Sequence, residues 1–200
     1  MSRKTWTGII LIGLISAITC VYLFRRHSPN MPRLRKVPPN NVVAANNLFA
    51  LDYYSRLKDR EKGNIFFSPF SVSLALAMTY EGAKGRTAEE IQSVFHFPED
   101  NTLRRTGYAA VLGRVNAKNK KYQLSTANAL WAQKDYPFLK EYLEVVENYY
   151  GGKTINLDFI KNPDSSRKII NKWVEDHTNN KIKDLIPQID SSIKLILTNA

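Results

Sequence analysis

The 200-residue chain is 44% apolar and 24% charged, which favours a globular domain over a disordered or fibrous protein. Its net charge of +11 is uneven: residues 1–40 hold seven Lys and Arg and no acid, which leaves 22 basic and 18 acidic residues for residues 41–200. A domain this mildly basic is not predicted to bind nucleic acid, and the single cysteine, Cys20, excludes an internal disulfide and a cysteine metal cluster.

The chain begins with an uncharged apolar run, residues 7–24, which two basic residues precede. Such a run is typical of a signal peptide or a single membrane anchor, and we assign residues 1–26 to one of these. An anchor fits the sequence better, because Arg25 follows at once without the small residues of a cleavage site. Lipidation at Cys20 and a buried core helix are the alternatives for this run.

A proline-rich basic linker, residues 27–41, is predicted next, because its four prolines prevent a packed helix or strand. Five basic residues follow the apolar run, whereas two precede it. This bias favours a cytoplasmic location for the C-terminal side.

Two helices are predicted after the linker. The first is indicated by apolar residues at three- and four-residue spacing, namely Val42, Ala45, Phe49, Tyr53 and Leu57. Ser68 is then a hydroxyl N-cap and Pro69 a favourable first helical residue, which predicts a second helix from there to about Tyr80. Because this second helix is apolar on nearly every face, we expect it to be central and buried.

The rest of the chain alternates predicted helices and strands. The capping-box spacing of Thr87 and Glu90 predicts a third helix from Thr87 to Phe95, and Pro137 predicts the start of another helix that ends near Tyr150. Periodicity indicates the remaining elements: a helix over residues 103–118, strands over 122–133 and 154–159, a helix from about residue 163 that carries Ile169, Ile170, Trp173 and Val174, and a strand over 192–200.

Several runs of the sequence together resemble the serpin family. The run NIFFSPFSVSLALAM, residues 64–78, is followed by EGAKGRT, residues 81–87. The similarity continues in order through TANAL, NKWVE and LILTNA, and it covers residues 42–200. It implies an α+β serpin fold that is incomplete: the N-terminal helices A to F with strands 1A, 2A and 3A of the central sheet.

The resemblance implies a suicide-substrate inhibitor of a serine protease, or of a cysteine protease. In the family a reactive-centre loop is cleaved, inserts into the central sheet beside strand 3A and traps the protease as an acyl-enzyme. That loop is absent from these 200 residues. The inhibitor needs no catalytic group, metal or cofactor, and an extracellular or membrane-anchored location is expected, with membrane contact through residues 7–24. The alternative is a non-inhibitory serpin that acts as a carrier, chaperone or polyanion-binding protein.

The resemblance also identifies candidate shutter residues, Ser68, Ser71 and Asn199. In the family they lie where helix B meets the sheet that must open, and their short polar side chains can exchange hydrogen bonds as strands part. An N-cap role for Ser68 is compatible with this one.

A basic cluster is expected on helix D, which in some serpins binds heparin-like polyanions: Arg104, Arg105, Arg114 and Lys118. A solvated helical face is the alternative. Phosphate-loop and nucleophile-elbow motifs are absent from the sequence, so no enzyme activity is predicted.

The last strand is expected to leave one edge unpaired. By resemblance its outer neighbour would be strand 5A, which these residues do not include. An unpaired apolar edge with Ile193, Leu195 and Leu197 is a template for aggregation, so self-association is predicted.

Overall fold

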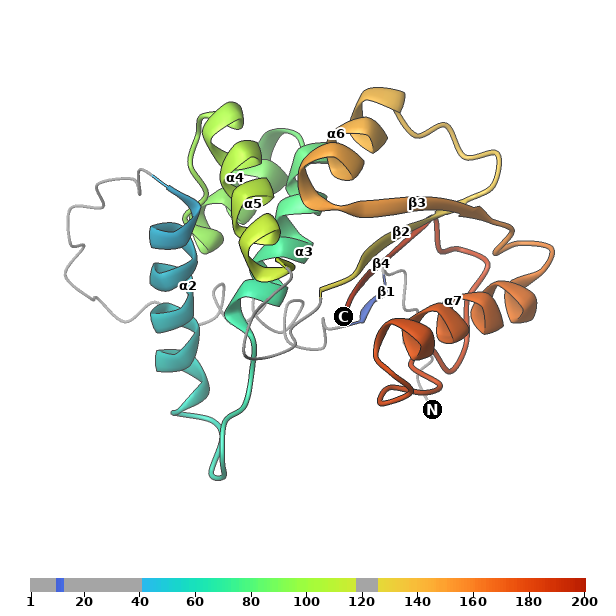
Figure 1. Cartoon of the computed structure of the whole chain (residues 1–200), viewed down its shortest axis with the longest axis horizontal. Coiled ribbons are helices and arrows are strands. Elements are labelled where there is room, and N and C mark those ends of the chain that lie inside the picture. Colours follow the sequence, from blue (N-terminus) through green and yellow to red (C-terminus); the bar gives the residue numbers. More distant parts are fainter. Residues whose placement is uncertain (1–9, 13–40, 118–125) are drawn as a thin grey trace.

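The computed structural model describes residues 10–12, 41–117 and 126–200, which form six helices and four strands (Figure 1). The α+β class and the order of elements agree with the sequence prediction. In chain order the elements are β1 (Ile10–Ile12), α2 (Val42–Leu57), α3 (Pro69–Gly82), α4 (Gly85–Phe95), α5 (Asn101–Val115), β2 (Asn128–Gln133), α6 (Lys140–Tyr150), β3 (Gly152–Leu157), α7 (Pro163–His177) and β4 (Leu195–Asn199).

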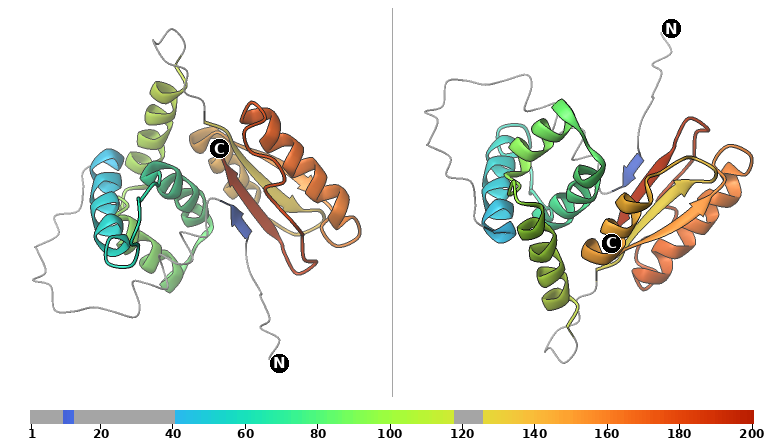
Figure 2. Two further views of the ribbon diagram at one scale, coloured as in Figure 1. Left: turned by 90° about the horizontal axis from the view of Figure 1, so that it is seen from below. Right: turned by 90° about the horizontal axis from the view of Figure 1, so that it is seen from above.

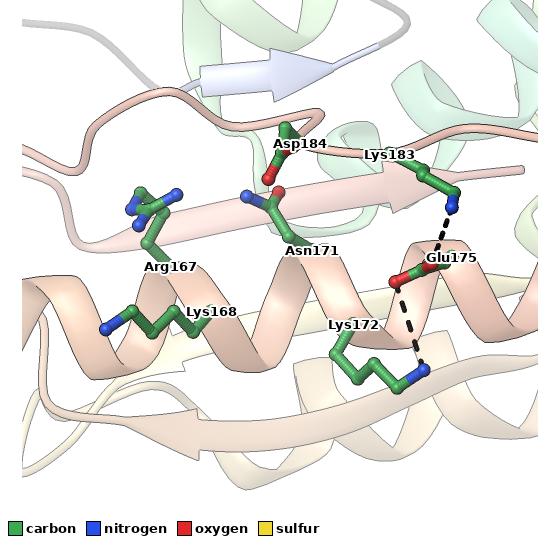
Figure 3. Close-up of a pocket in the computed structure, with 7 residues that line it drawn as sticks. All are labelled: Arg167, Lys168, Asn171, Lys172, Glu175, Lys183 and Asp184. Carbon is green, nitrogen blue, oxygen red and sulfur yellow. Dashed lines mark ion pairs between the residues drawn. The ribbon is translucent and has the colours of Figure 1, made fainter. Parts of the chain in front are cut away.

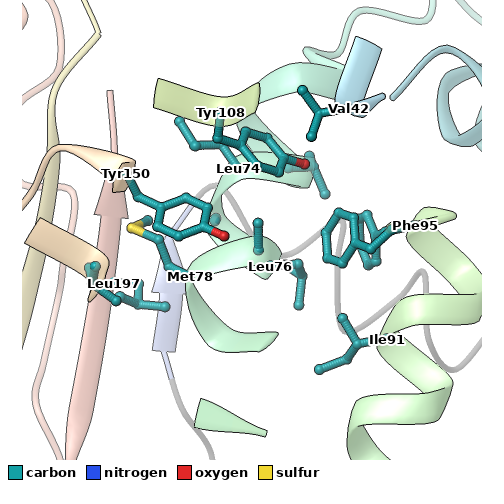
Figure 4. Close-up of a cluster of buried hydrophobic side chains, with 14 of the residues drawn as sticks. Val42, Leu74, Leu76, Met78, Ile91, Phe95, Tyr108, Tyr150 and Leu197 are labelled. Carbon is teal, nitrogen blue, oxygen red and sulfur yellow. The ribbon is translucent and has the colours of Figure 1, made fainter. Parts of the chain in front are cut away.

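Helix α3 is central and buried, as predicted. Its N-cap is Ser68, whose Oγ accepts a hydrogen bond from the Ser71 amide at 3.3 Å, and Pro69 occupies the first helical position. Every residue from Val72 to Met78 is buried. This helix packs against α2, α4, α6 and β4, so it connects the helical part of the fold to the sheet (Figure 4).

The sheet has the strand order β1-β4-β2-β3. Strand β2 is parallel to β3 and antiparallel to β4, with Asn128 opposite Gly152 on one side and Asn199 on the other. All six residues of β2 are buried. Helices α3 and α6 lie on one side of the sheet, and α7 lies on the other (Figures 1 and 2).

Two hydrophobic cores lie on the two faces of the sheet, because successive residues of a strand point to opposite faces. Leu130 and Leu197 belong to the core shared with the helices, shown in Figure 4. Trp131 and Ile196 belong to the core under α7. There the ring of Trp131 meets that of Trp173 edge-on, with centroids 5.6 Å apart.

Two predicted helix starts were wrong. Helix α4 begins at Gly85, two residues before Thr87, and its N-cap Lys84 makes no side-chain capping bond. The left-handed backbone of Gly85, with φ of 54°, turns the chain into the helix earlier than the capping-box spacing indicated. Helix α6 begins at Lys140 and not at Pro137, because the preceding residues form a turn in which the Phe138 amide donates to the Tyr136 carbonyl at 2.8 Å.

The predicted strands were placed correctly but were too long or were shifted by two residues. Residues 122–125 of the first one lie outside the described residues. The last strand begins at Leu195 and not at residue 192. A turn precedes it, in which the Ile193 amide donates to the Asp190 carbonyl at 3.1 Å.

The N-terminal predictions fall mostly outside the described residues. Of the segment 1–26, residues 10–12 are described, and they form strand β1; of the linker 27–41, only Asn41 is described. Among the described residues, none of the helices combines the length and the apolar character needed to span a bilayer.

The outer edge of β4 is not left open as predicted. Strand β1 pairs with it in parallel, with Ile10 opposite Ile196 and Ile12 opposite Thr198. The expectation of an unpaired edge is therefore wrong over these residues, because the N-terminal segment supplies a neighbour that the family resemblance did not suggest.

Two glycines of α5 provide a matched test of how this helix packs on α2. A Cβ atom at Gly107 would lie 2.9 Å from both γ carbons of Val42, whereas one at Gly113 would meet nothing within 4 Å. Gly113→Ala should raise the free energy of unfolding by up to about 1 kcal/mol, because alanine loses less backbone entropy on folding. Gly107→Ala should lower it by about 1–3 kcal/mol, because the stiff Val42 side chain must move. Urea unfolding followed by circular dichroism measures both, and equal shifts would contradict this packing.

Candidate functional site

Asn128, the first residue of β2, is a buried polar residue of the sheet. Its buried side chain accepts a hydrogen bond at Oδ1 from Asn199 Nδ2 at 2.6 Å, and its Nδ2 donates to the Tyr150 carbonyl at 2.9 Å. Asn199 ends β4 and lies opposite Asn128 in the ladder, whereas Tyr150 ends α6. One buried amide therefore joins β2 both to β4 and to α6.

Further hydrogen bonds join β4 to β2 along the inner edge of β4, which is the edge that faces β2. Beyond the strand ends, Ala127 and Ala200 exchange two backbone hydrogen bonds, at 2.8 and 2.9 Å. Within the strands, Trp131 Nε1 donates to Thr198 Oγ1 at 3.1 Å. Separating β4 from β2 would break buried side-chain bonds as well as the ladder, so parting of the sheet costs less at the outer edge of β4.

The candidate shutter residues fall on two elements. Ser68 and Ser71 lie at the start of α3, and Asn199 lies at the end of β4. The N-cap role of Ser68 is confirmed. Within residues 41–117 and 126–200, no hydrogen bond joins either serine to Asn199, whose side chain is bonded to Asn128. The shutter role of the three residues stays a prediction.

Sequence reasoning did not assign a role to Asn128. The signal that could have identified it is an asparagine inside a strand whose other residues are mostly apolar, because asparagine is depleted in strands. A polar side chain in such a place must find hydrogen-bond partners when it is buried.

A second polar cluster lies between α3, α5 and α6 and is centred on Glu81. Its side chain is 2% exposed. Arg104 donates from Nε and Nη2 to Oε1 at 3.2 and 3.0 Å, and Arg105 donates from Nε and Nη2 to Oε2 at 3.1 and 2.8 Å. The Tyr150 hydroxyl donates to Oε1 at 2.6 Å. Glu81 thus accepts hydrogen bonds from three side chains, two on α5 and one on α6.

These contacts keep Glu81 ionised. Burial by itself would raise the pKa of the Glu81 carboxyl, but hydrogen bonds from Arg105 and Tyr150 and the charge of Arg104 outweigh it and hold the pKa below its ordinary value. Burial, and then the charge of Glu81, raise the pKa of the Tyr150 hydroxyl far above its usual range. Tyr150 therefore stays protonated and remains a hydrogen-bond donor.

The expected basic surface of α5 must be corrected for Arg104. This side chain is 2% exposed, since it pairs with Glu81, donates from Nη1 to the Pro98 carbonyl at 3.1 Å and lies over the ring of Tyr80. A polyanion cannot reach it. Arg105 is partly exposed and also paired with Glu81, Arg114 is exposed, and Lys118 lies outside the described residues.

A hollow of about 290 Å³ lies between α7 and the segment that follows it (Figure 3). It is lined by Arg167, Lys168, Asn171, Lys172, Glu175, Lys183 and Asp184. Each of its four cations pairs with an acid: the first two with Asp164, Lys172 with Asp176 and Glu175, and Lys183 with Glu175. Every cation of the lining is thus engaged in an ion pair. Among the described residues, no group of three or more His, Cys, Asp or Glu side chains could hold a metal ion.

The comparison with known families decides what this fold is. Residues 44–200 match the family model described as Serpin (serine protease inhibitor). The chain belongs to the serpin family. This serpin is 47% identical over 165 residues to an uncharacterized serpin-like protein of Methanosarcina acetivorans, a match that covers 80% of this chain and 39% of the relative. It is 38% identical over 179 residues to human serpin B3, which covers 80% and 46%.

Solved serpin structures share the fold. A loop-inserted, cleaved ovalbumin mutant superposes with a TM-score of 0.73 at 31% identity, covering 80% of this chain and 46% of that one. Cleaved kallistatin complexed with heparin gives a TM-score of 0.71 at 26% identity, covering 79% and 47%. The chain thus spans less than half the length of the relatives that it matches.

The Glu81 cluster predicts a large loss of stability when the carboxylate is removed. Glu81→Gln should lower the free energy of unfolding by about 3–5 kcal/mol, because it leaves the buried Arg104 charge without its partner. Glu90→Gln is the matched control. It breaks the exposed i,i+4 pair with Arg86 and should change stability by less than about 0.5 kcal/mol. Urea unfolding compares the two variants, and similar losses would show that the buried cluster has no special role.

The same cluster predicts a pH dependence. Because the pKa of Glu81 in the folded protein lies below the unfolded value of 4.5, its contribution is complete above that pH and is lost as the pH falls through the folded pKa. Wild-type stability should therefore drop more steeply than that of Glu81→Gln as the pH falls from about 5 to about 3. Unfolding midpoints measured across this range test the difference, and parallel curves would contradict it.

Proposed function

We propose that this serpin is the N-terminal part of a serine protease inhibitor that inserts a cleaved loop into its central sheet. The family description supports the inhibitor class, and the similar ovalbumin structure, which is described as loop-inserted, supports the mechanism. The observation that carries the proposal is the asymmetry of β4. Its inner edge is fastened to β2 through Asn128 and Asn199, whereas its outer edge pairs with a strand of three residues.

Insertion of a strand beside β4 would pair the backbone groups of its outer edge. New main-chain hydrogen bonds in a buried sheet are a driving force for such a change. The Asn128 side chain would keep β2, β4 and the end of α6 together meanwhile, so the sheet opens on one side only. Ser68 and Ser71 are the proposed shutter residues at the start of α3. The nucleophile belongs to the protease, and the inhibitor requires neither a catalytic group nor a cofactor.

The partners and the location are part of the same proposal. The target is a serine protease, with a cysteine protease as the alternative, and inhibition belongs to a protein with the full length of the relatives, which would carry the reactive-centre loop. Residues 1–26 would direct export or anchor the domain at a membrane. The charge bias around residues 7–24 opposes export, but an inhibitor of extracellular proteases requires it.

A non-inhibitory role, as a carrier, chaperone or polyanion-binding protein, is the second candidate. The kallistatin structure, which is described as complexed with heparin, favours polyanion binding. In this chain such a surface would have to use Arg114 and Lys118, with Arg105 contributing only its partly exposed side chain. Arg104 is excluded by its burial.

The inhibitor proposal predicts that residues 42–200 support trapping once a reactive loop is supplied. We would join them to the C-terminal part of a serpin whose inhibition has first been verified in the same assay. The chimera should form a covalent complex with the protease that survives denaturing gel electrophoresis, because the sheet accepts the loop. The 200-residue chain alone should form none. A folded chimera that is cleaved without forming a covalent complex would favour the non-inhibitory role. A covalent complex between the protease and the 200-residue chain alone would contradict the proposal that trapping requires a supplied loop.

A further inference from the structure

The chain that follows α7 turns back along this helix before it reaches β4. We call residues 178–193 the return segment (Figure 3). Near its start, the Asn180 amide donates to the Glu175 carbonyl of α7 at 2.9 Å. Further on, Ile186 bonds to the side chain of Asn171, about one turn earlier in the helix. The contacts step backward along α7, so the return segment runs antiparallel to it.

The Asn171 side chain joins the helix to the return segment in the interior. Its Nδ2 donates to the Ile186 carbonyl at 2.9 Å, and its Oδ1 accepts from the Ile186 amide at 2.8 Å. Asn171 is 7% exposed and Ile186 is 0% exposed. Buried backbone groups outside a helix or strand need partners from elsewhere, and here one side-chain amide supplies both. We call this pair of hydrogen bonds the Asn171 clip.

An exposed contact between the same two parts is weaker. Lys183 Nζ lies 3.4 Å from Glu175 Oε1, and the Lys183 side chain is 62% exposed. An ion pair that is open to solvent contributes little to stability. Loss of the Asn171 clip, by contrast, would leave the buried backbone groups of Ile186 unsatisfied. The clip is therefore the stronger of these two polar links.

The return segment also fills the core beneath α7. Its Ile186, Ile189 and Ile193 are at most 5% exposed and pack in one cluster with Ile170 of α7 and Ile196 of β4. Helix and segment thus cover the same face of the sheet. If the segment left, α7 would lose three of the side chains that fill the core beneath it, so the position of each part depends on the other.

A turn connects the return segment to β4. Asp190 accepts from the Ser192 amide at Oδ1, at 2.8 Å, and from the Ile193 amide at its carbonyl, at 3.1 Å. The pairing of β4 with β2 begins directly after this turn, where the Gln133 amide donates to the Lys194 carbonyl at 2.9 Å. The Asn171 clip thus lies within the cover formed by α7 and the return segment, and the turn separates that cover from the sheet.

We propose that Asn171 is a positioning residue that makes α7 and the return segment one cooperative cover of the face of β2 and β4. While the clip is closed, the two parts stay together and open together. The link to inhibition rests on the proposed function, because a strand that enters beside β4 widens the sheet beneath this cover. A cover held as one body can shift over the widened sheet without unfolding of α7.

The test is amide hydrogen exchange of the full chain, followed residue by residue by NMR at urea concentrations below the unfolding transition. In wild type, the amides of Ile186 and Val174 should show the same opening free energy and the same dependence on urea, because one opening exposes both. The amide of Leu130 in β2 should require a larger opening. A lower opening free energy for Ile186 than for Val174 would overturn the proposal, and so would one urea dependence shared by all three amides.

Removal of the clip provides the second arm. Asn171→Ala removes both hydrogen bonds and should raise the exchange rate of the Val174 amide at least about tenfold, because α7 loses the support of the return segment. If α7 were a separate body, the same change would slow that exchange, since alanine has the highest helix propensity. Lys172→Ala is the matched control at the neighbouring exposed position. It should change the rate by less than about threefold, because it breaks only exposed ion pairs.

Unchanged or slower exchange of the Val174 amide in Asn171→Ala would contradict a shared cover. A rise of equal size at Leu130 would also do so, because it would show a general loss of stability in place of a looser cover. None of these readings involves a protease. The Asn171 clip can therefore fail its test while the chimera traps its target, and the chimera can fail while α7 and the return segment open together.

Discussion

Burial of β2 on both faces is the constraint around which the described fold is built. Its residues alternate between two cores, so Leu130 packs with the helices on one side and Trp131 packs under α7 on the other. Both neighbouring strands hydrogen bond to it. A strand in this position can admit a polar side chain only where its polar atoms find hydrogen-bond partners, and Asn128 meets this condition because its oxygen bonds to β4 and its nitrogen to α6. The side-chain link between β2 and β4 follows from this requirement.

The Glu81 cluster performs a similar task for the helices. A buried carboxylate is tolerated because two guanidinium groups and a phenol surround it. The arginines come from α5 and Tyr150 comes from α6, so the carboxylate at the end of α3 fixes both helices relative to it. Tyr150 also links the two polar clusters, since its hydroxyl binds Glu81 and its carbonyl accepts from Asn128. Helices and sheet are in this way held by one connected set of hydrogen bonds.

Much of the architecture could be predicted from local patterns. The Ser68-Pro69 cap and the apolar run of α3 predicted a buried helix at the right place, because caps and periodicity act over a few residues. The start of α4 was missed, since the backbone of Gly85 and not the side chain of Thr87 determines it. Arg104 was placed on the surface because helical charge patterns do not show which partner lies across the interface. Its partner, Glu81, is 23 residues away in the sequence.

The pairing of β1 with β4 could not be predicted for a related reason. An apolar run after basic residues has the composition of a targeting segment, and composition does not reveal a free sheet edge elsewhere in the chain. Asn199 was a candidate site residue because of the family resemblance. Its partner Asn128 could be recognised only once the register of β2 against β4 was known. Long-range pairs of this kind are fixed by topology and not by local sequence.

The tryptophan geometry gives this serpin a built-in optical reporter. Trp131 is fully buried, its indole N–H is bonded to Thr198 of β4, and its ring meets Trp173 of α7. Indole emission shifts to longer wavelength when water reaches the ring. The wavelength of the emission maximum would therefore report whether β2, β4 and α7 stay packed together, without any attached dye. The chain has one further tryptophan, Trp6, in the N-terminal segment. Replacing Trp6 by phenylalanine would leave a signal that comes entirely from the sheet and its covering helix.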